Sequence, residues 1–235
     1  MTSRSAVCII SGGLDSVAFA FYLKEIKNLS PYTITFFYGQ KSVEEMKRAR
    51  IFADLLKSKA HMEVDISFLK NLYGDTNVLT GPGCDIPGKF NQSIVVPHRN
   101  AIFLTVSAAW TARLNVDVIA YGAHADDQNY PDCRQRFVSS IENMLYESDL
   151  DASHLGLRRR IEIWCPAKEG IHKRDLARIG YKLLGDKVFS TWSCYHDEQR
   201  NRENLPIHCG LCESCVNRKA TFNAANIEDR TEYAG

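Results

Sequence analysis

The chain has 235 residues, which predicts either one domain with a small appendage or two small domains, and the 45% of them that are hydrophobic are enough for a core. Its 29 Lys and Arg residues against 28 Asp and Glu residues give a net charge of +1, so no global basic field is present to attract nucleic acid. The sequence contains no apolar run of the roughly 18 residues that a membrane helix needs. Residues 1–5 lead straight into the first predicted strand and leave no room for a signal peptide, so we expect a cytoplasmic protein.

Strand-like and helix-like periodicities alternate along the chain. Strands are predicted at 6–10, 33–38, 62–66, 117–121 and 161–165, and helices at 16–27, 43–57, 101–114, 134–147 and 173–183. This alternation predicts an α/β fold, with a doubly wound, mainly parallel five-stranded sheet and helices on both faces.

Two segments of this pattern carry further expectations. The helix at 101–114 is apolar nearly all round, which predicts deep burial. Between residues 72 and 93, glycine and proline interrupt every period. We expect a long loop there, which is either a lid over a site or a passive insertion.

The first predicted strand runs into the glycine turn Ser11-Gly12-Gly13-Leu14-Asp15-Ser16, and Ser16 is placed to cap a helix that begins near Val17. The glycines allow a tight turn, and the backbone N–H groups with the positive end of the helix form a cradle for phosphate. The motif lacks the Lys of the Walker A pattern and the spacing of the dinucleotide fingerprint. The alternative is an ordinary strand-to-helix turn that contains two glycines.

Further polar segments follow other predicted strands or the long loop. Open parallel sheets bind ligands at the carboxyl ends of their strands, so these segments should meet the first loop at one edge. They are Tyr38-Gly39-Gln40-Lys41, Val96-Pro97-His98-Arg99-Asn100, Gly122-Ala123-His124-Ala125-Asp126-Asp127 and Tyr130-Pro131-Asp132-Cys133-Arg134.

The eight cysteines fall into two groups. Cys8, Cys84, Cys133 and Cys165 are scattered, whereas Cys194, Cys209, Cys212 and Cys215 gather near the C-terminus with a C-x₂-C-x₂-C run. Four thiolates at this spacing suit a tetrahedral structural Zn²⁺, with backbone N–H groups pointing at the sulfurs. We therefore divide the chain into a main domain at 1–185 and a zinc-binding region of helix and loop at 186–235.

Alternatives to zinc remain open at this point. His196 and His208 are competing ligands, an iron–sulfur cluster is the main rival, and four free thiols are the third possibility. A zinc held by four cysteines has no open coordination position, so its expected role is to fold the C-terminal region onto the main domain. Gly210 would relieve the turn between the ligands.

The Ser11–Ser16 motif resembles the pyrophosphate loop of the N-type ATP pyrophosphatases. That resemblance implies cleavage of ATP between its α- and β-phosphates, with adenylylation of a substrate oxygen and later displacement of AMP. It also implies that Asp15 is associated with Mg²⁺, which neutralises polyphosphate charge.

Four motifs together narrow the resemblance to the 7-cyano-7-deazaguanine synthase family, over about residues 6 to 222. They are Val96–Asn100, Tyr130–Arg134, Thr191-Trp192-Ser193-Cys194-Tyr195, and the run from His208 to Cys215. The resemblance implies that ATP activates the carboxylate of 7-carboxy-7-deazaguanine and that ammonia then gives an amide. A second ATP converts the amide to the nitrile. A homodimer is also implied.

Site residues follow from this resemblance and from residue type. The expected catalytic residues are Asp15, Arg99 and Lys173, with Lys173 stabilising the leaving pyrophosphate. The expected ATP and magnesium residues are Ile10, Ser11, Gly12, Gly13, Leu14, Asp15, Ser16, Tyr38, Gln40, Asn100 and Gly122. The expected substrate residues are Arg99, Asp127, Tyr130, Asp132 and Arg134.

The expected substrate residues would make different contacts with the base. Asp132 would accept from the N1–H and amino groups of the base, and Tyr130 would stack on it. Structural alternatives are a salt bridge for Arg99, core packing for Tyr130 and a solvated helix start for Lys173. Cys133 is expected to be a small packed residue and not a nucleophile.

Some positions depart from the family pattern. His98 stands where members of the family often have glycine, residues 145–162 match nothing in the family, and the segment between Pro166 and Lys173 is longer by about one residue. One alternative is therefore a paralogue that joins a deazaguanine to another amine, such as a protein. A tRNA-modifying relative and a non-catalytic module with an RNA-contacting zinc tail are the others. The near-neutral charge counts against nucleic acid as a partner.

Overall fold

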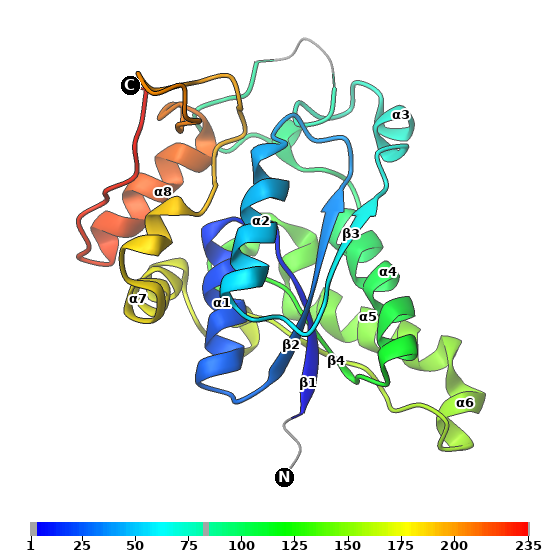
Figure 1. Ribbon diagram of the computed structural model, residues 1–235. Coiled ribbons are helices and arrows are strands. Elements are labelled where there is room, and N and C mark those ends of the chain that lie inside the picture. Colours follow the sequence, from blue (N-terminus) through cyan, green and yellow to red (C-terminus); the bar gives the residue numbers. More distant parts are fainter. Residues whose placement is uncertain (1–3, 82–84, 235) are drawn as a thin grey trace.

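A parallel sheet lies at the centre of the computed structural model, which describes residues 4–81 and 85–234 (Figure 1). Within the described residues it has five strands in the order β3-β2-β1-β4-β5, and every pairing is parallel. The strands are β1 (Ser5–Ile9), β2 (Ser30–Phe37), β3 (His61–Asp65), β4 (Val118–Ala120) and β5 (Glu162–Trp164). The predicted sheet is confirmed. The chain reverses its direction of winding between β1 and β4, which is where open sheets of this kind bind ligands.

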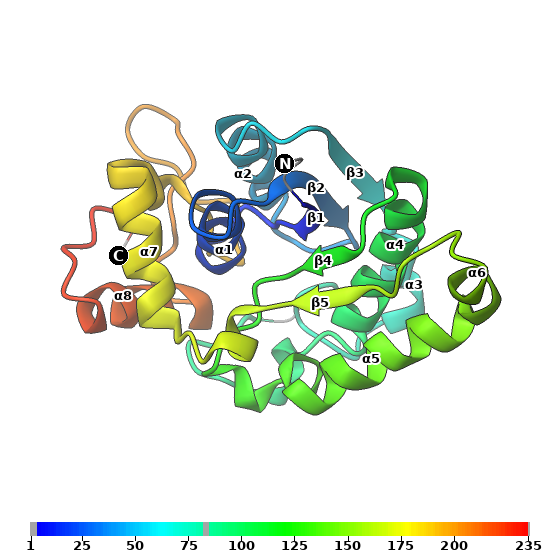
Figure 2. The ribbon, with the colours of Figure 1, turned by 90° about the horizontal axis from the view of Figure 1, so that it is seen from below.

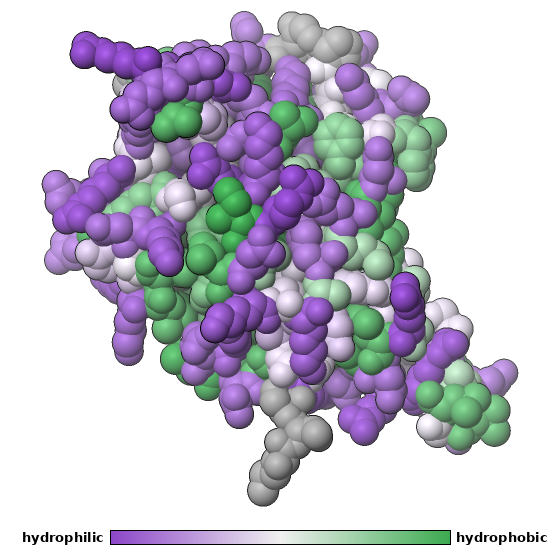
Figure 3. All heavy atoms as spheres, in the orientation of Figure 1, coloured by the Kyte–Doolittle hydropathy of each residue, from purple (hydrophilic) through white to green (hydrophobic). Residues whose placement is uncertain are grey.

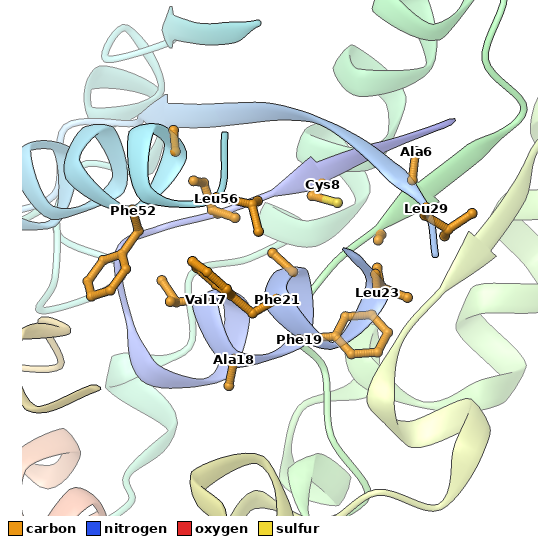
Figure 4. Close-up of a cluster of buried hydrophobic side chains, with 14 of the residues drawn as sticks. Ala6, Cys8, Val17, Ala18, Phe19, Phe21, Leu23, Leu29, Phe52 and Leu56 are labelled. Carbon is orange, nitrogen blue, oxygen red and sulfur yellow. The ribbon is translucent and has the colours of Figure 1, made fainter. Parts of the chain in front are cut away.

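Helices cover both faces of the sheet (Figure 2). One face carries α1 (Leu14–Glu25), α2 (Glu44–Leu55) and α7 (Lys173–Leu184), and the other carries α4 (Arg99–Leu114) and α5 (Gln135–Ser148). The two faces follow from the alternation of side chains along a strand. Ala6 and Cys8 of β1 pack against α1 and α2 in the cluster of Figure 4, whereas Val7 packs on the opposite side.

The helix predicted at 101–114 is less buried than its composition suggests. In α4, Leu104 and Trp110 are buried against the sheet, but Thr105 and Ala109 are exposed. The helix lies in an outer layer, so one side faces solvent, and small side chains such as alanine occur there at little cost. The expectation of deep burial all round is therefore wrong.

Among the described residues, three α-helices lie outside the five predicted ranges. They are α3 (Leu69–Tyr73), α6 (Leu150–His154) and α8 (Glu213–Ala224), of which α8 lies in the C-terminal region where helix and loop were expected. The segment 145–162, which matched no family feature, contains α6 at an edge of the molecule. Leu155 and Leu157 are 75% and 70% exposed there, where Figure 3 shows apolar atoms on a largely polar face.

The C-terminal region packs on α1 and α7 through its own apolar cluster. Phe222 of α8 is fully buried together with Leu14, Ala177 and Val188. Beside it, the buried guanidinium of Arg218 donates to the carbonyls of Val188 and Phe189 and to nearby hydroxyls. This side chain ties α8 to the segment that follows α7.

The described parts of the long loop, residues 72–81 and 85–93, make specific contacts. The side-chain oxygen of Asn77 accepts from the N–H groups of Leu79 and Thr80, and the carbonyl of Pro87 accepts from the N–H of Glu213. Cys84, one of the scattered cysteines of the sequence, lies outside the described residues. In the described part of the chain, no helix has both the length and the hydropathy of a membrane span.

Candidate active site

A cavity of about 770 Å³ opens at the carboxyl ends of β1, β2 and β4. Its size is in the range of sites that hold a nucleotide or a drug-sized ligand. The predicted site residues on its wall are Ile10, Ser11, Gly13, Leu14, Asp15, Ser16, Tyr38, Gln40, Arg99, Asn100, Gly122, Asp127, Tyr130 and Lys173. The convergence that the sequence predicted is thus confirmed for these residues, whereas Gly12, Asp132 and Arg134 are absent from the cavity wall.

The glycine turn lines one part of the cavity. Gly13 is the N-cap of α1, which begins at Leu14, so the expected start near Val17 is corrected. The hydroxyl of Ser16 accepts from the N–H of Ser11 and donates to the carbonyl of Gly13, so it braces the turn rather than capping the helix. The N–H groups of the first helical turn have no partner within a helix and are available to an anion.

At two positions in or beside this turn, neighbouring backbone atoms lie so close that only glycine fits. Gly12 has φ +81°, and a Cβ there would lie 2.5 Å from the carbonyl oxygen of Glu45 and 2.7 Å from the nitrogen of Ala49. A Cβ on Gly122 would lie 2.9 Å from the nitrogen of Ser16. The glycine turn is therefore packed directly on α2 and on the end of β4. Gly12 faces α2 and is not among the residues that line the cavity.

An ion pair joins the two helix starts at this end. The ammonium of Lys173 lies 3.1 Å from Oδ2 of Asp15, and the ring of His124 lies 3.9 Å from the same oxygen. Burial alone would raise the pKa of Asp15, but Lys173 beside it lowers that pKa below its usual value. Oδ1 of Asp15 is buried without a hydrogen-bond partner. An ionised carboxylate with an open oxygen is what a Mg²⁺ ligand requires, so these residues fit the metal.

Two more carboxylates follow His124. Oδ2 of Asp127 accepts from the N–H of His124, and burial raises the pKa of Asp127. Asp126 lies 2.7 Å from Nδ1 of His172 and accepts from the N–H of Lys173. These contacts fix the start of α7 and with it the position of the Lys173 ammonium.

Arg99 enters the cavity from the start of α4. Its guanidinium carbon lies 5.9 Å from the ring centroid of Tyr38. The preceding residue, His98, has φ +58°, the left-handed conformation that favours glycine. Glu45, which the sequence did not single out, also lines the cavity, and burial raises its pKa to about 8.

Aromatic side chains form the other end of the cavity. The rings of Phe90 and Tyr130 meet edge to face with centroids 5.5 Å apart, and both line the cavity with Tyr195. Phe90 belongs to the long loop, so that loop contributes to the site. Glu213 lines the cavity from α8, where its carboxylate accepts from the hydroxyl of Tyr195 at 3.3 Å.

Two predicted substrate residues do not line the cavity. Oδ2 of Asp132 accepts from the N–H of Asn100 at the start of α4, and the guanidinium of Arg134 donates twice to the carbonyl of Gln128. Local backbone groups therefore occupy both side chains. Cys133 does line the cavity, but burial raises the pKa of its thiol, which fits the expected packing role and not a nucleophile.

The four C-terminal cysteines form a candidate metal centre. Their sulfurs all lie within 4.8 Å of one another, with Cys194 and Cys212 at 4.0 Å and Cys209 and Cys215 at 3.9 Å. Four sulfurs around a tetrahedral Zn²⁺ at about 2.3 Å would be about 3.8 Å apart, whereas a disulfide needs about 2.05 Å. The set therefore fits zinc.

Backbone N–H groups donate to sulfurs of this group, as the spacing of the cysteines predicts. The N–H groups of Cys209 and His196 point at the sulfur of Cys194, and that of Cys212 points at the sulfur of Cys209. Gly210 has φ +79°. Among the described residues, neither candidate histidine joins the group, because Nε2 of His208 accepts from the N–H of Ser193 and His196 faces Glu198.

Comparisons with known proteins agree on one family. The family model described as queuosine biosynthesis protein QueC matches residues 5–226. A curated 7-cyano-7-deazaguanine synthase from Caldicellulosiruptor bescii is 36% identical over 234 residues, which is 97% of this chain and 96% of that protein. Proteins of the same name from Coxiella burnetii and Archaeoglobus fulgidus are 36% and 32% identical, over 98% and 95% of this chain and 98% and 88% of theirs.

Proposed function

The chain belongs to the queuosine biosynthesis protein QueC family, and from this premise we propose that it is an ATP-dependent ligase that makes 7-cyano-7-deazaguanine from 7-carboxy-7-deazaguanine and ammonia. The observation that carries the proposal is one cavity whose wall contains both the glycine turn and a pair of aromatic rings. Such a cavity suits a nucleoside triphosphate and a flat base side by side.

The reaction has two activation steps at one carbon. A carboxylate oxygen attacks the α-phosphorus of ATP and pyrophosphate leaves, and ammonia then displaces AMP to give the amide with release of a proton. The amide oxygen attacks a second ATP in the same way. Loss of AMP and of both amide protons leaves the nitrile. One site serves both steps, because each activates an oxygen on the same carbon.

The residues of the glycine turn have matching roles in this reaction. The N–H groups at the start of α1 would hold the phosphates, and Lys173 would stabilise the leaving pyrophosphate. Asp15 would hold Mg²⁺, which neutralises the charge of the polyphosphate when bound. Arg99 would grip the substrate carboxylate or the α-phosphate, since a guanidinium fits either oxyanion. Tyr38 and Gln40 would flank the adenosine.

The cysteine group would hold a structural Zn²⁺ that closes the C-terminal region onto the main domain. On the family resemblance we also infer a homodimer in the cytoplasm. Light scattering on the purified protein tests the oligomeric state directly.

The test is an assay of purified protein with 7-carboxy-7-deazaguanine, ATP, magnesium and ammonium, followed by mass spectrometry. We expect the nitrile base together with AMP and pyrophosphate. Asp15→Asn should abolish all of them, whereas Asp151→Asn, at an exposed position of α6, should not. Accumulation of amide without nitrile, or no AMP from folded protein, would contradict the proposal.

A further inference from the structure

Glu213 occupies an unusual position within the cysteine motif. It lies between Cys212 and Cys215, so the sequence presents it as a spacer between two metal ligands. In the structure its side chain is only 6% exposed, yet it lines the substrate cavity. A buried carboxylate that faces a cavity needs hydrogen-bond donors, because its desolvation is costly otherwise.

Two neutral donors fix the orientation of this carboxylate. The hydroxyl of Tyr195 donates to Oε2 at 3.3 Å, and the amide of Asn217, one turn further along α8, donates to Oε1 at 2.6 Å. Each carboxylate oxygen can accept about two hydrogen bonds, so one acceptor position on each oxygen is left for a ligand.

The other carboxyl groups on the cavity wall lie elsewhere. Asp15, Asp126 and Asp127 gather around Lys173, His124 and His172 at the phosphate end. Glu45 lies on α2, whose backbone packs against the glycine turn. Among the described lining residues, Glu213 is the carboxylate that accepts a hydrogen bond from an aromatic side chain of the cavity, the hydroxyl of Tyr195.

The backbone around Glu213 also holds the aromatic end together. Its N–H donates to the carbonyl of Pro87 at 2.9 Å, and a Cβ on Gly88 would lie 3.0 Å from the carbonyl oxygen of Leu211. The segment that carries Phe90 is therefore packed against the cysteine motif. Phe90 in turn meets Tyr130 edge to face.

Resting on the proposed function, we propose that Glu213 is the specificity-determining residue that reads the edge of the deazaguanine. Its two oxygens accept from the ring N1–H and the exocyclic amine, which are adjacent donors that match a carboxylate in bidentate fashion. Tyr130 and Phe90 hold the plane of the ring. A base without the exocyclic amine leaves one buried oxygen unpaired and is rejected for that reason.

This role replaces the one that the sequence suggested for Asp132, whose carboxylate is used at the start of α4. The proposed role of Glu213 also links the cysteine group to substrate recognition. The metal centre fixes the loop that positions both Glu213 and the segment of Phe90.

The experiment measures binding by isothermal titration for 7-carboxy-7-deazaguanine and for its analogue that lacks the 2-amino group. In the wild-type protein we expect the deazaguanine to bind about tenfold or more tightly than the analogue. This difference in affinity corresponds to the loss of about one hydrogen bond to a charged group. Glu213→Gln should weaken deazaguanine binding by roughly 10- to 100-fold and the analogue much less. Glu213→Asp should keep the preference for the amine in part.

Controls separate recognition from folding. Zinc content, melting temperature and affinity for a non-hydrolysable ATP analogue should be unchanged in Glu213→Gln. Glu228→Gln, at an exposed glutamate, should bind both bases as the wild type does. If Glu213→Gln does not fold, Asn217→Ala on the exposed side of α8 should weaken deazaguanine binding several-fold.

Two results would overturn the inference. One is wild-type affinity for the deazaguanine in Glu213→Gln or in Asn217→Ala. The other is an equal loss of binding affinity for the deazaguanine and for its analogue in Glu213→Gln. A wild-type protein that binds neither base and makes no nitrile would instead refute the proposed function, so the two failures are distinguishable.

Discussion

The ammonium of Lys173, the first residue of α7, lies 3.1 Å from the carboxylate of Asp15 in the first turn of α1. The starts of two helices that are far apart in the sequence are therefore joined by an ion pair beside the glycine turn. Under the proposed function Lys173 has two tasks there, because it lowers the pKa of Asp15 and would offer a positive charge to the leaving pyrophosphate.

Lys173→Met should separate these tasks through its pH dependence. Loss of the cation should lower kcat/KM for ATP by roughly 10²- to 10³-fold, as for the removal of one transition-state donor. Without Lys173 the burial of Asp15 is less opposed, so its pKa should rise. The acid limb of the pH–rate profile should then move to higher pH, because Asp15 must be ionised to hold magnesium. Lys182→Met, on the exposed side of the same helix, is the matched control, and an unshifted acid limb would contradict the account.

Glu45 should make the protein less stable as the pH rises. Its folded pKa of about 8 lies above the unfolded value of 4.5, so between these values the folded state binds more protons than the unfolded state. Stability then falls with rising pH by about 1 kcal/mol per pH unit from this one group. Glu45→Gln removes that slope. The free energy of unfolding of the variant should therefore rise relative to that of the wild type from pH 5 to 8, and the difference should level off above pH 8.

Urea unfolding at several pH values measures this difference. The exposed Glu147→Gln on α5 serves as the control and should follow the wild type at every pH. Parallel stability curves for the wild type and Glu45→Gln would show that the Glu45 carboxyl titrates normally in the folded protein.

Gly12→Ala should destabilise the fold far more than a similar change elsewhere. The new Cβ would collide with the backbone of Glu45 and Ala49, which cannot move without shifting α2. We expect a loss of about 3 kcal/mol in the free energy of unfolding, from overpacking together with the cost of positive φ. Gly156→Ala also has positive φ but meets nothing within 4 Å, so it should cost only about 1 kcal/mol. Equal losses measured by urea unfolding would contradict the role of close packing.

The strands and major helices could be predicted because their apolar periodicity is local. The convergence at the edge of the sheet then follows from the general rule for ligand sites in parallel sheets. The strand order itself was not predicted. The errors have tertiary causes. Ser16 braces the glycine turn because its hydroxyl accepts from the N–H of Ser11. One side of α4 is exposed because this helix lies in an outer layer. Neither relationship has a signal in the local sequence.

Cavity-lining residues were predicted better at the glycine turn than at the aromatic end of the cavity. The glycine turn is one continuous motif, so its residues stay together in any fold that contains it. Asp132 follows β4 as expected, but its side chain turns to the start of α4 instead of the cavity. Glu213 could not be singled out, because the spacing of its neighbours already explained the motif as a metal centre. Its orientation depends on Tyr195 and Asn217, which only the tertiary structure brings to it.

Loss of one cysteine ligand should remove the metal and loosen the C-terminal region. In Cys215→Ser we expect the zinc content, measured by elemental analysis, to fall from one per chain to near zero. The free energy of unfolding should drop by about 3 kcal/mol, which is a melting temperature lower by roughly 6–12 °C in a chain of this size. Cys165→Ala is the matched control, because this buried cysteine lies outside the group of four and should leave the zinc content unchanged. Iron and visible absorption in the wild-type protein would refute zinc in favour of a cluster. A variant that keeps its zinc would show that three sulfurs hold the ion without the fourth.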